Sequence, residues 1–456
     1  MPAIRLYDTR TRELRELEPR DPGRVGVYAC GPTVYNRIHV GNARPFVVFS
    51  LLKRLLEHEG LAVTLVVNVT DVNDKIYDAA RALGVPSAQL AAEMTAAYVA
   101  DTDRLGLGRP DHEPRAAETI GPIVEMIQAL IDGGHAYVAQ GDVYFRVRSD
   151  PGYGSLSRRD VDQMDQGEGI EGALLKEDPL DFALWKAHKQ DEDTSWEAPW
   201  GRGRPGWHIE CSAMAEELLG VGFDVHGGGN DLIFPHHENE AAQTRAARGA
   251  EIARIWMHNG MLRMGEEKMA KSVGNVALLG EVLDRWGRDA LVWLLCTGHY
   301  RQPLTFDDEA MERATRTVAG VREAGRRLTD GASPAQLAPL RERFFDALRD
   351  DFNTPQALAV VSEWVREANR RLDAGEDVGA ADLREMLGVL GLETLLEARA
   401  PEAPAGVVAL AEARRAARAA RDFGESDRLR DEIAAAGWTV RDVPGGYELI
   451  GPAGPG

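Results

Sequence analysis

The chain of 456 residues is poor in cysteine, in lysine and in long hydrophobic runs. Its three cysteines, Cys30, Cys211 and Cys296, are too few and too widely spaced for a disulfide framework or an all-cysteine zinc site. No apolar run approaches the roughly 20 residues that span a bilayer, and the first residues lack the apolar core of a signal peptide. The sequence therefore predicts a cytoplasmic protein that does not enter a membrane.

An excess of positive charge is also missing, because 53 Lys and Arg face 73 Asp and Glu, for a net charge of −20. This balance argues against a protein that coats nucleic acid through bulk electrostatics, although it leaves room for a local basic surface. The 44% hydrophobic and 28% charged residues are typical of folded domains, and at roughly 150 residues per domain the length predicts about three.

The order of the predicted elements indicates an α/β fold. Residues 24–29 and 61–69 have the composition of buried strands, and apolar residues at helical spacing from Phe46 to Leu56 predict a helix between them. A strand, loop, helix and strand in this order form one unit of a parallel sheet. Residues 136–139 and 142–147 predict a hairpin, and residues 149–206, which lack periodicity, are interpreted as an insertion.

The predicted organisation has five parts. The α/β domain covers residues 1–148 and 207–279, divided by the insertion of residues 149–206. An α-helical bundle follows over residues 280–398, in which Thr354 is a good N-cap with Pro355 at the first helical position. Residues 399–456 are expected to form a linker and a small α+β domain, with one helix over residues 408–435 and a short β segment.

A loop at residues 30–44 has the form of a phosphate site, with His39, Gly41 and Asn42 at the start of the predicted helix. Unpaired backbone N–H groups and the helix dipole favour an anion at such a position. His39 and Asn42 can donate hydrogen bonds to phosphate oxygens, and Gly41 lets a flat ring approach the backbone. Taken alone, the loop is equally consistent with an ordinary βα turn that carries incidental polar residues.

A second loop, at residues 265–275, contains Lys268 and Lys271, two of only seven lysines in the chain; the others are Lys53, Lys75, Lys176, Lys186 and Lys189. Because the chain otherwise relies on arginine, two lysines in a glycine-flanked loop indicate compact, mobile charges for a transferring phosphoryl group. A solvated charged loop is the alternative for this segment alone. The two loops together are far more specific than either one.

Histidines are concentrated in the middle of the chain, at His188, His208, His226, His236, His237 and His258. A predicted helix puts His236 and Glu240 at i and i+4 on one face. Cys211 lies on the preceding helix, and Cys30 ends the first strand, where a parallel sheet brings its loop ends together. Cys30, Cys211, His236 and Glu240 would form a mixed zinc site, whereas each cysteine taken singly is more simply a buried structural residue.

These residues together resemble the cysteinyl-tRNA synthetase family, which belongs to the class I aminoacyl-tRNA synthetases, over essentially the whole chain. Residues 39–42 and 268–272 match the two ATP signatures of the class, and residues 28–35, 203–214, 234–240, 256–260 and 351–355 are similar to segments peculiar to this family. Three positions depart from its pattern: Asn42 replaces a histidine, Ala270 replaces a serine, and Tyr447 stands where tryptophan is usual.

The resemblance implies a Rossmann-like parallel-sheet catalytic domain, a connective insertion, a helical stem-contact and bundle domain, and a C-terminal anticodon-binding domain. It also implies activation of L-cysteine by ATP with Mg²⁺, followed by transfer to the 3′ end of tRNA(Cys). The implied catalytic residues are His39, Asn42, Lys268 and Lys271, and ATP would contact His39, Gly41, Asn42, Gly228, Asp231 and Lys271. The implied cysteine contacts are Gly31, Thr70, Trp207 and His226.

One Zn²⁺ per chain would let such an enzyme select cysteine over serine, since a soft thiolate bonds to zinc in a way that the hydroxyl of serine cannot match.

On the C-terminal helix, Arg414, Arg418 and Arg421 fall at i, i+4 and i+7. Their sequence context slightly favours a solvated helix paired with Glu412 and Asp422, but the resemblance favours contact with the tRNA anticodon. A monomer is expected.

Two other functions fit parts of the pattern. The first is a related ligase that joins cysteine to an amino sugar in mycothiol synthesis, and residues 351–355 with the C-terminal domain argue against it. The second is a non-catalytic zinc-binding RNA module, and the presence of both lysines and both phosphate-loop residues argues against that.

Overall fold

The computed structural model describes residues 3–164, 174–264, 267–268, 277–397, 403–443 and 446–450. The chain forms two units, Met1–Leu395 and Leu396–Gly456, and each is described here by itself. No helix within these ranges is both long enough and apolar enough to cross a membrane.

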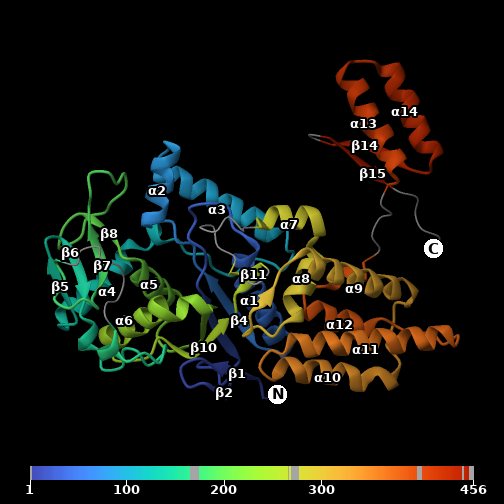
Figure 1. The fold of residues 1–456 in the computed structure, drawn as a ribbon. Coiled ribbons are helices and arrows are strands. Elements are labelled where there is room, and N and C mark those ends of the chain that lie inside the picture. The colour runs from blue at the N-terminus through green and yellow to red at the C-terminus, as the bar shows by residue number, and fades with distance from the viewer. Residues whose placement is uncertain are drawn as a thin grey trace. The chain divides into compact units, whose positions relative to one another are not determined.

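A four-stranded parallel sheet lies at the centre of the first unit (Figure 1). Its strands are β3 (Arg24–Ala29), β4 (Ala62–Val67), β9 (Phe223–Gly229) and β10 (Ala253–Asn259), in the order β10-β9-β3-β4. Helix α1 (Val40–His58) connects β3 to β4, so the βαβ unit expected from the sequence is confirmed. The strands are rich in buried Val and Leu, as expected for a sheet covered on both faces.

The carboxyl ends of these strands gather the loops that carry the candidate residues. Cys30 follows β3, Asn68 follows β4, and Gly227, Gly228 and Gly229 end β9. The chain leaves β3 toward β4 and leaves β9 toward β10, so the two connections run to opposite sides of the sheet from adjacent strands. Such a point opens a crevice in which α/β proteins bind their ligands.

The insertion contributes to a second sheet, which is antiparallel. It contains β5 (Ala136–Ala139), β6 (Asp142–Phe145), β7 (Phe182–Ala187) and β8 (Gly203–Pro205), paired in sequence order. The predicted hairpin is therefore present, and it pairs with strands of the insertion rather than with the parallel sheet. Helices α4 (Ile120–Asp132), α5 (Trp207–Leu219) and α6 (Glu238–Arg248) pack beside it around Ile127, Phe145 and Trp185.

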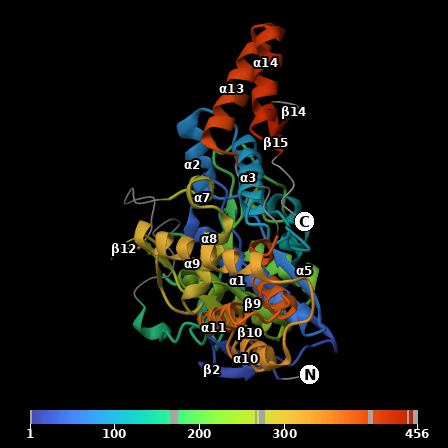
Figure 2. The ribbon, with the colours of Figure 1, turned by 90° about the vertical axis from the view of Figure 1, so that its right-hand side faces the viewer.

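The remaining elements of the first unit are mostly helices. They are α2 (Asp74–Leu83), α3 (Ser87–Asp103), α7 (Leu279–Trp286), α8 (Arg288–Thr297), α9 (Asp308–Arg327), α10 (Ala338–Arg349), α11 (Thr354–Asp373) and α12 (Ala381–Val389), with the short strands β1 (Arg5–Asp8), β2 (Glu13–Glu16), β11 (Leu262–Met264), β12 (Glu267–Lys268) and β13 (Leu304–Thr305). Helices α9 to α12 pack together beside the parallel-sheet domain (Figures 1 and 2). The cap of α11 is Asn353 rather than the predicted Thr354, because the Asn353 side chain accepts a hydrogen bond from Gln356 N.

The second unit contains two helices and a hairpin, α13 (Ala405–Ala419), α14 (Phe423–Ala435), β14 (Thr439–Val443) and β15 (Gly446–Ile450). The single helix predicted over residues 408–435 is wrong. Arg421 has a left-handed backbone with φ of 60°, which ends the first helix. Asp422 then caps the second helix by accepting a hydrogen bond from Glu425 N. Val407, Ile433 and Trp438 form the core.

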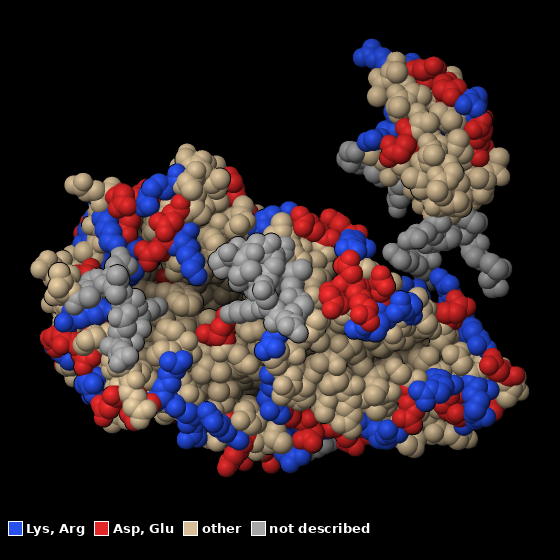
Figure 3. Space-filling view, viewed as in Figure 1, with Lys and Arg blue, Asp and Glu red and all other residues tan. Residues whose placement is uncertain are grey.

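Lys and Arg side chains are interspersed with Asp and Glu on the face of the first unit that is seen in Figure 3. No continuous basic surface is visible among the described residues of that face. The picture agrees with the net charge of −20, which argues against bulk electrostatic coating of nucleic acid.

Candidate active site and metal centre

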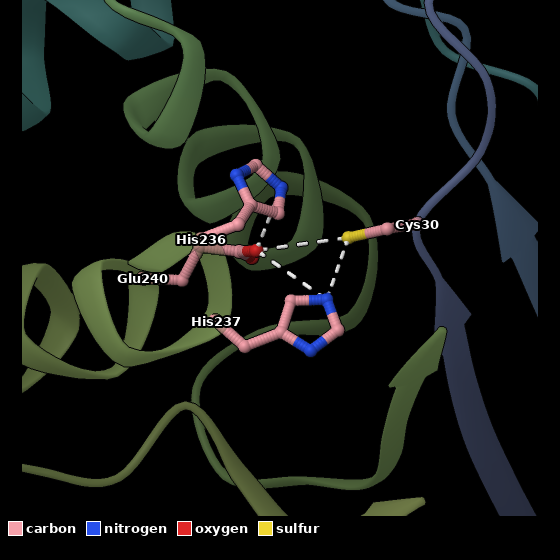
Figure 4. Close-up of side chains that lie close together, drawn as sticks. All are labelled: Cys30, His236, His237 and Glu240. Carbon is pink, nitrogen blue, oxygen red and sulfur yellow. Dashed lines mark hydrogen bonds and ion pairs between the residues drawn. The ribbon is translucent and has the colours of Figure 1, made fainter. Parts of the chain in front are cut away.

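Four buried side chains converge at the carboxyl edge of the parallel sheet: Cys30, His236, His237 and Glu240 (Figure 4). Cys30 Sγ lies 3.2 Å from His237 Nε2 and 3.6 Å from Glu240 Oε1. His236 Nε2 lies 3.1 Å from the same carboxylate oxygen, so the predicted i, i+4 pair does share one face. One thiol, two imidazoles and one carboxylate within 4.8 Å of one another are the donor types that bind zinc.

Cys211, the remaining predicted ligand, is buried on α5 beside this group. Its thiol contacts the Cys30 thiol and the Tyr28 hydroxyl. His237 therefore belongs to the four mutually close atoms although the sequence did not select it, and Cys211 lies next to them through Cys30.

A second layer of hydrogen bonds holds these side chains in place. His226 Nε2 lies 2.9 Å from Glu240 Oε2, and His236 Nδ1 lies 2.8 Å from His208 Nδ1. His237 Nδ1 lies 2.7 Å from Nε2 of His258. In both His236 and His237 the Nδ1 atom is thus engaged and the Nε2 atom faces the centre of the group. This is the support that metal-binding imidazoles receive, and the donor set fits a zinc ion.

Burial sets the protonation of the group. It lowers the pKa of His236 and His237 well below the ordinary value, helped by the neighbouring histidines, and lowers that of His258 to about 3. Burial also raises the pKa of the Cys30 thiol, with the nearby Cys211 and Glu240 adding to the rise. Without a cation the imidazoles are neutral and this thiol is protonated, whereas a bound cation favours the thiolate.

The pKa of Cys211 is raised as well. The hydrogen bond with Cys30 acts to lower it, but burial and the negative charges of Glu240 and Glu210 outweigh that bond. Both sulfurs of the cluster therefore share the same response to a cation: each would have to release a proton in order to bind one.

His39 and Asn42 hold the start of α1 by capping one another. His39 Nδ1 accepts from Asn42 N at 3.3 Å, and Asn42 Oδ1 accepts from His39 N at 3.2 Å. Since Nδ1 is the acceptor, the neutral ring carries its proton on Nε2, which makes that edge of the imidazole a donor. The N-terminus of α1 thus has the donor character predicted for a phosphate site.

Backbone hydrogen bonds connect the residues that follow the lysine segment to the predicted phosphate loop. Val40 N donates to Ala277 O at 2.9 Å, and Leu279 N donates to Ile38 O at 3.1 Å. Lys268 is described through its backbone, in β12, while Lys271 and Ala270 lie outside the described residues. Ala277 and Leu279, which follow the lysine segment in the chain, therefore lie beside the start of α1, next to His39.

Three family models match the chain in succession. Residues 16–316 match the class I (C) tRNA synthetase catalytic domain, residues 343–394 the DALR domain, and residues 400–448 the cysteinyl-tRNA ligase anticodon binding domain. The chain belongs to the cysteine-tRNA ligase family. The first of these models alone covers more than half of the chain.

Curated relatives of the family match at full length. Cysteine-tRNA ligase of Symbiobacterium thermophilum is 45% identical, with 97% of this chain and 98% of the relative covered. That of Chromohalobacter salexigens is 46% identical, with 96% and 97% covered. Among solved structures, Mycobacterium tuberculosis methionyl-tRNA synthetase in complex with methionyl-adenylate has a TM-score of 0.61 at 16% identity, over 82% of this chain and 88% of that one, which shows the shared class I fold.

The residues that the family resemblance assigns to cysteine lie around the four-residue group. The Trp207 ring stacks on His236 at 4.1 Å between centroids, and His226 holds Glu240. Gly31 follows Cys30, and a Cβ there would lie 1.8 Å from Asn68 O, so only glycine fits. Thr70 forms an isolated bridge with Thr33. The structure thus gathers all four at one edge of the sheet.

A cavity of about 280 Å³ opens beside Trp207, between the parallel sheet and the insertion sheet. Its other lining residues include Thr33, Lys75, Lys186 and Arg204. The buried Arg204 guanidinium lies against Glu192 at 2.9 Å and also contacts Asp74. The insertion therefore forms one wall of the site region, which the sequence pattern of residues 149–206 did not indicate.

The two residues assigned to ATP at the end of β9 have different surroundings. Gly228 lies against the metal group, since a Cβ there would lie 3.6 Å from Cys30 Cβ and 3.2 Å from the His237 ring. Asp231 is exposed, two residues after the end of the strand. Gly228 is therefore needed for close packing at the cluster, and Asp231 lies at the surface.

The three arginines expected at the anticodon do not form one exposed row. Arg414 is 5% exposed, so it packs inside the second unit, while Arg418 and Arg421 are exposed. Glu412, the predicted partner of this helix, pairs with Arg415 at 2.9 Å and accepts from Tyr447 Oη at 2.9 Å. Tyr447, a departure from the family pattern, therefore has a structural contact within its unit.

Sequence reasoning missed several residues that support the site: His208, His237, His258, Asn68 and Glu210. The clustering of histidines in the middle of the chain was the only available signal, and it did not show which ring would face which neighbour. Asn68 and Glu210 gave no signal, because a single polar residue after a strand or on a helix is common.

Proposed function

We propose that the chain activates L-cysteine with ATP to form cysteinyl-adenylate and pyrophosphate, and then transfers cysteine to the 3′ end of tRNA(Cys). The observation that carries the proposal is the buried group of thiol, imidazole and carboxylate at the edge of the sheet. It lies where β3 also delivers the phosphate loop, so a metal-bound substrate and a nucleotide would share one crevice. Membership of the cysteine-tRNA ligase family supports the same reaction.

Zinc is the metal that the proposal assigns to the site, with Cys30, Cys211, His236 and Glu240 as ligands. Two touching thiols support this set, since soft thiolates select zinc over hard cations. His237, which is close to the Cys30 thiol, then supports the site from the side. When bound, the ion supplies a soft position for the substrate thiolate that the hydroxyl of serine does not match.

The protein residues act mainly by positioning. The carboxylate of cysteine must attack the α-phosphorus in line, and charge develops on the equatorial oxygens. The Nε2–H of His39 and the N-terminus of α1 would hold the phosphates, together with Asn42 and Gly41. Lys268 and Lys271 would stabilise the developing charge, and Mg²⁺ would accompany the pyrophosphate.

The acceptor is tRNA rather than an amino sugar in this proposal. The match of residues 400–448 to an anticodon binding domain favours tRNA, because an amino-sugar ligase has no use for such a unit. Contact with the anticodon through Arg418 and Arg421, a cytoplasmic location and a monomeric state stay predictions.

Cysteine-dependent exchange between ATP and pyrophosphate tests the activation step. We expect exchange with cysteine, little with serine, and loss of the cysteine signal after treatment with a chelator that Zn²⁺ reverses. Equal exchange with both amino acids, or full activity of metal-free protein, would contradict the role of zinc. Charging of tRNA(Cys) against an amino-sugar acceptor then identifies the second substrate.

A further inference from the structure

A short chain of buried polar groups connects the loops that follow β3 and β4. Asn68, which is fully buried, accepts a hydrogen bond from Gly31 N at 2.9 Å through its Oδ1 atom. Its Nδ2 atom donates to Thr70 Oγ1 at 3.2 Å. A backbone N–H can only donate, so the carbonyl side of the Asn68 amide must face Gly31 and the NH₂ side must face Thr70.

This arrangement fixes the direction in which the Thr70 hydroxyl points. Its oxygen accepts from Asn68, so its own hydrogen is free to donate elsewhere. The backbone of Thr70 is held on both sides, since Thr70 N donates to Pro32 O at 3.1 Å and Val34 N donates to Thr70 O at 3.1 Å. With the backbone fixed and one lone pair of the oxygen occupied by Asn68, the hydroxyl hydrogen is directed away from the Asn68 amide.

The Glu210 carboxyl lies beside this hydroxyl, on helix α5. It is fully buried, and neither oxygen has a well-formed hydrogen bond to any residue that the structure describes. Buried carboxyl oxygens are rarely left in this state, because an unsatisfied polar group destabilises the fold. The polar chain from Gly31 through Asn68 and Thr70 therefore ends at the Glu210 carboxyl, whose oxygens can accept from the Thr70 hydroxyl.

The same amide also fixes the loop after β3. Gly31 approaches the Asn68 backbone so closely that a Cβ would lie 1.8 Å from its carbonyl oxygen. Gly31 directly follows Cys30, and Thr70 is paired with Thr33 of the same loop. One side chain thus sets the positions of the two residues, Gly31 and Thr70, that are expected to contact cysteine from the β3 and β4 loops.

We propose that Asn68 is a positioning residue that sets the affinity for cysteine by fixing the Gly31 peptide and the direction of the Thr70 hydroxyl. The inference rests on the proposed function, because Gly31 and Thr70 matter only if cysteine binds at this edge of the sheet. Asn68 acts through these two neighbours and has no exposed surface of its own. A merely structural role would instead affect both substrates or only the stability.

Asn68→Asp is the informative substitution. It keeps the shape and the acceptor for Gly31 N, but it replaces the donor that faces Thr70 with an acceptor, so the hydroxyl must turn toward the new carboxylate. We expect KM for cysteine in the exchange assay to rise about tenfold, as for the loss of one hydrogen bond, while KM for ATP stays within about twofold. Asn353→Asp, the same chemical change at the cap of α11, is the matched control and should alter neither KM.

Thr70→Val and the double variant show whether Asn68 acts through Thr70. Thr70→Val is expected to raise KM for cysteine, Thr70→Ser to restore it, and Asn68→Asp to add little in the Thr70→Val background. The inference is overturned if Asn68→Asp leaves KM for cysteine unchanged, raises both KM values alike, or adds fully to Thr70→Val. If Asn68→Asp does not fold, an unchanged KM in Thr70→Val overturns it equally.

The wild-type protein separates this inference from the proposed function. Wild-type exchange with cysteine combined with unaffected variants would remove only the role of Asn68. A wild-type protein that shows no cysteine-dependent exchange would overturn the proposed function and the role of Asn68 with it.

Discussion

At the scale of single residues, the candidate metal centre contains one more possible ligand than a tetrahedral site needs. Cys30, His236 and Glu240 are members of both possible ligand sets, and the fourth ligand would be either Cys211 or His237. The touching thiols favour Cys211, and the short distance from Cys30 to His237 Nε2, 3.2 Å, is equally compatible with a supporting contact.

Substitution of the two candidates separates these roles. We expect Cys211→Ala to lower zinc affinity by ~100-fold or more and to weaken cysteine binding, whereas His237→Ala, which removes a supporting contact, should cost at most about 10–100-fold. Metal analysis after dialysis, together with cysteine titration, measures both effects. Cys296→Ala, at a buried cysteine on α8, is the control and should keep its zinc. Unchanged metal content and cysteine affinity in Cys211→Ala would contradict the proposed ligand set.

The buried histidines also predict how metal-free protein responds to acid. Burial lowers the pKa of His236, His237 and His258 in the folded chain, so these rings stay neutral there while they gain protons in the unfolded chain. The folded state is therefore destabilised as the pH falls below about 6.5, by up to about 1.4 kcal/mol per ring and pH unit.

For His258 the loss continues down to a pH of about 3, its pKa in the folded chain. Thermal melts of chelated protein between pH 7.5 and 5 measure the effect. Zinc-loaded protein is the comparison, and it should lose less over the same range because the metal holds the site. Melting temperatures of the metal-free protein that do not depend on pH over this range would show that the rings are not buried neutral.

At the scale of elements, the start of α1 combines a helix cap with the proposed phosphate site. The capping pair of His39 and Asn42 satisfies backbone groups of the first turn, and the same turn is the proposed phosphate site. These two roles can be separated because a carboxylate caps a helix as well as an amide does but repels phosphate.

Asn42→Asp is therefore expected to leave the melting temperature unchanged or slightly raised, since negative charge is favourable at a helix N-terminus. It should raise KM for ATP by about tenfold or more through charge repulsion. Asn42→Ala is the comparison, and it should lose about 1 kcal/mol of stability with the cap. A normal KM for ATP in Asn42→Asp would place the phosphates elsewhere.

The break between α13 and α14 offers a second test at this scale. The Arg421 backbone lies in the left-handed region, so Arg421→Gly should stabilise the second unit or leave its stability unchanged, in contrast to most surface changes.

If Arg418, at the exposed end of α13, contacts tRNA, Arg418→Gln should weaken tRNA binding. It should also reduce the slope of log K against log salt concentration by about one. Arg414→Gln should act on the stability of the unit, because Arg414 is buried.

At the scale of the whole molecule, the division into Met1–Leu395 and Leu396–Gly456 separates the candidate active site from the residues that match an anticodon binding domain. The candidate active site lies entirely within the first unit. A chain that ends at residue 403 is therefore expected to keep cysteine-dependent exchange with pyrophosphate while its KM for tRNA rises. Exchange kinetics and aminoacylation of the shortened protein measure the two steps. An unchanged KM for tRNA would contradict the role assigned to the C-terminal unit.

Local features were predictable from the sequence for local reasons. The strands predicted at 24–29 and 61–69, the connecting helix and the i, i+4 pair of His236 and Glu240 follow from short-range periodicity, and all are present, the second strand over 62–67. The β5–β6 hairpin was found in the same way, but its pairing with β7 was not. The cap at Asn353 and the helix break at Arg421 were missed because each depends on the backbone conformation of a single residue.

The sequence by itself determined the candidates for the chemistry: two loops proposed to bind phosphate, and cysteine, histidine and carboxylate side chains proposed as metal ligands, each recognisable by residue type and spacing. Only the tertiary structure decided which side chains meet. His237 lies in the candidate metal group, Arg414 is buried within the second unit, and Asn68 lies between Gly31 and Thr70. The physical reason is that spacing along a chain fixes neighbours within one helix or strand, whereas contacts between elements depend on how the sheet edges and helices pack.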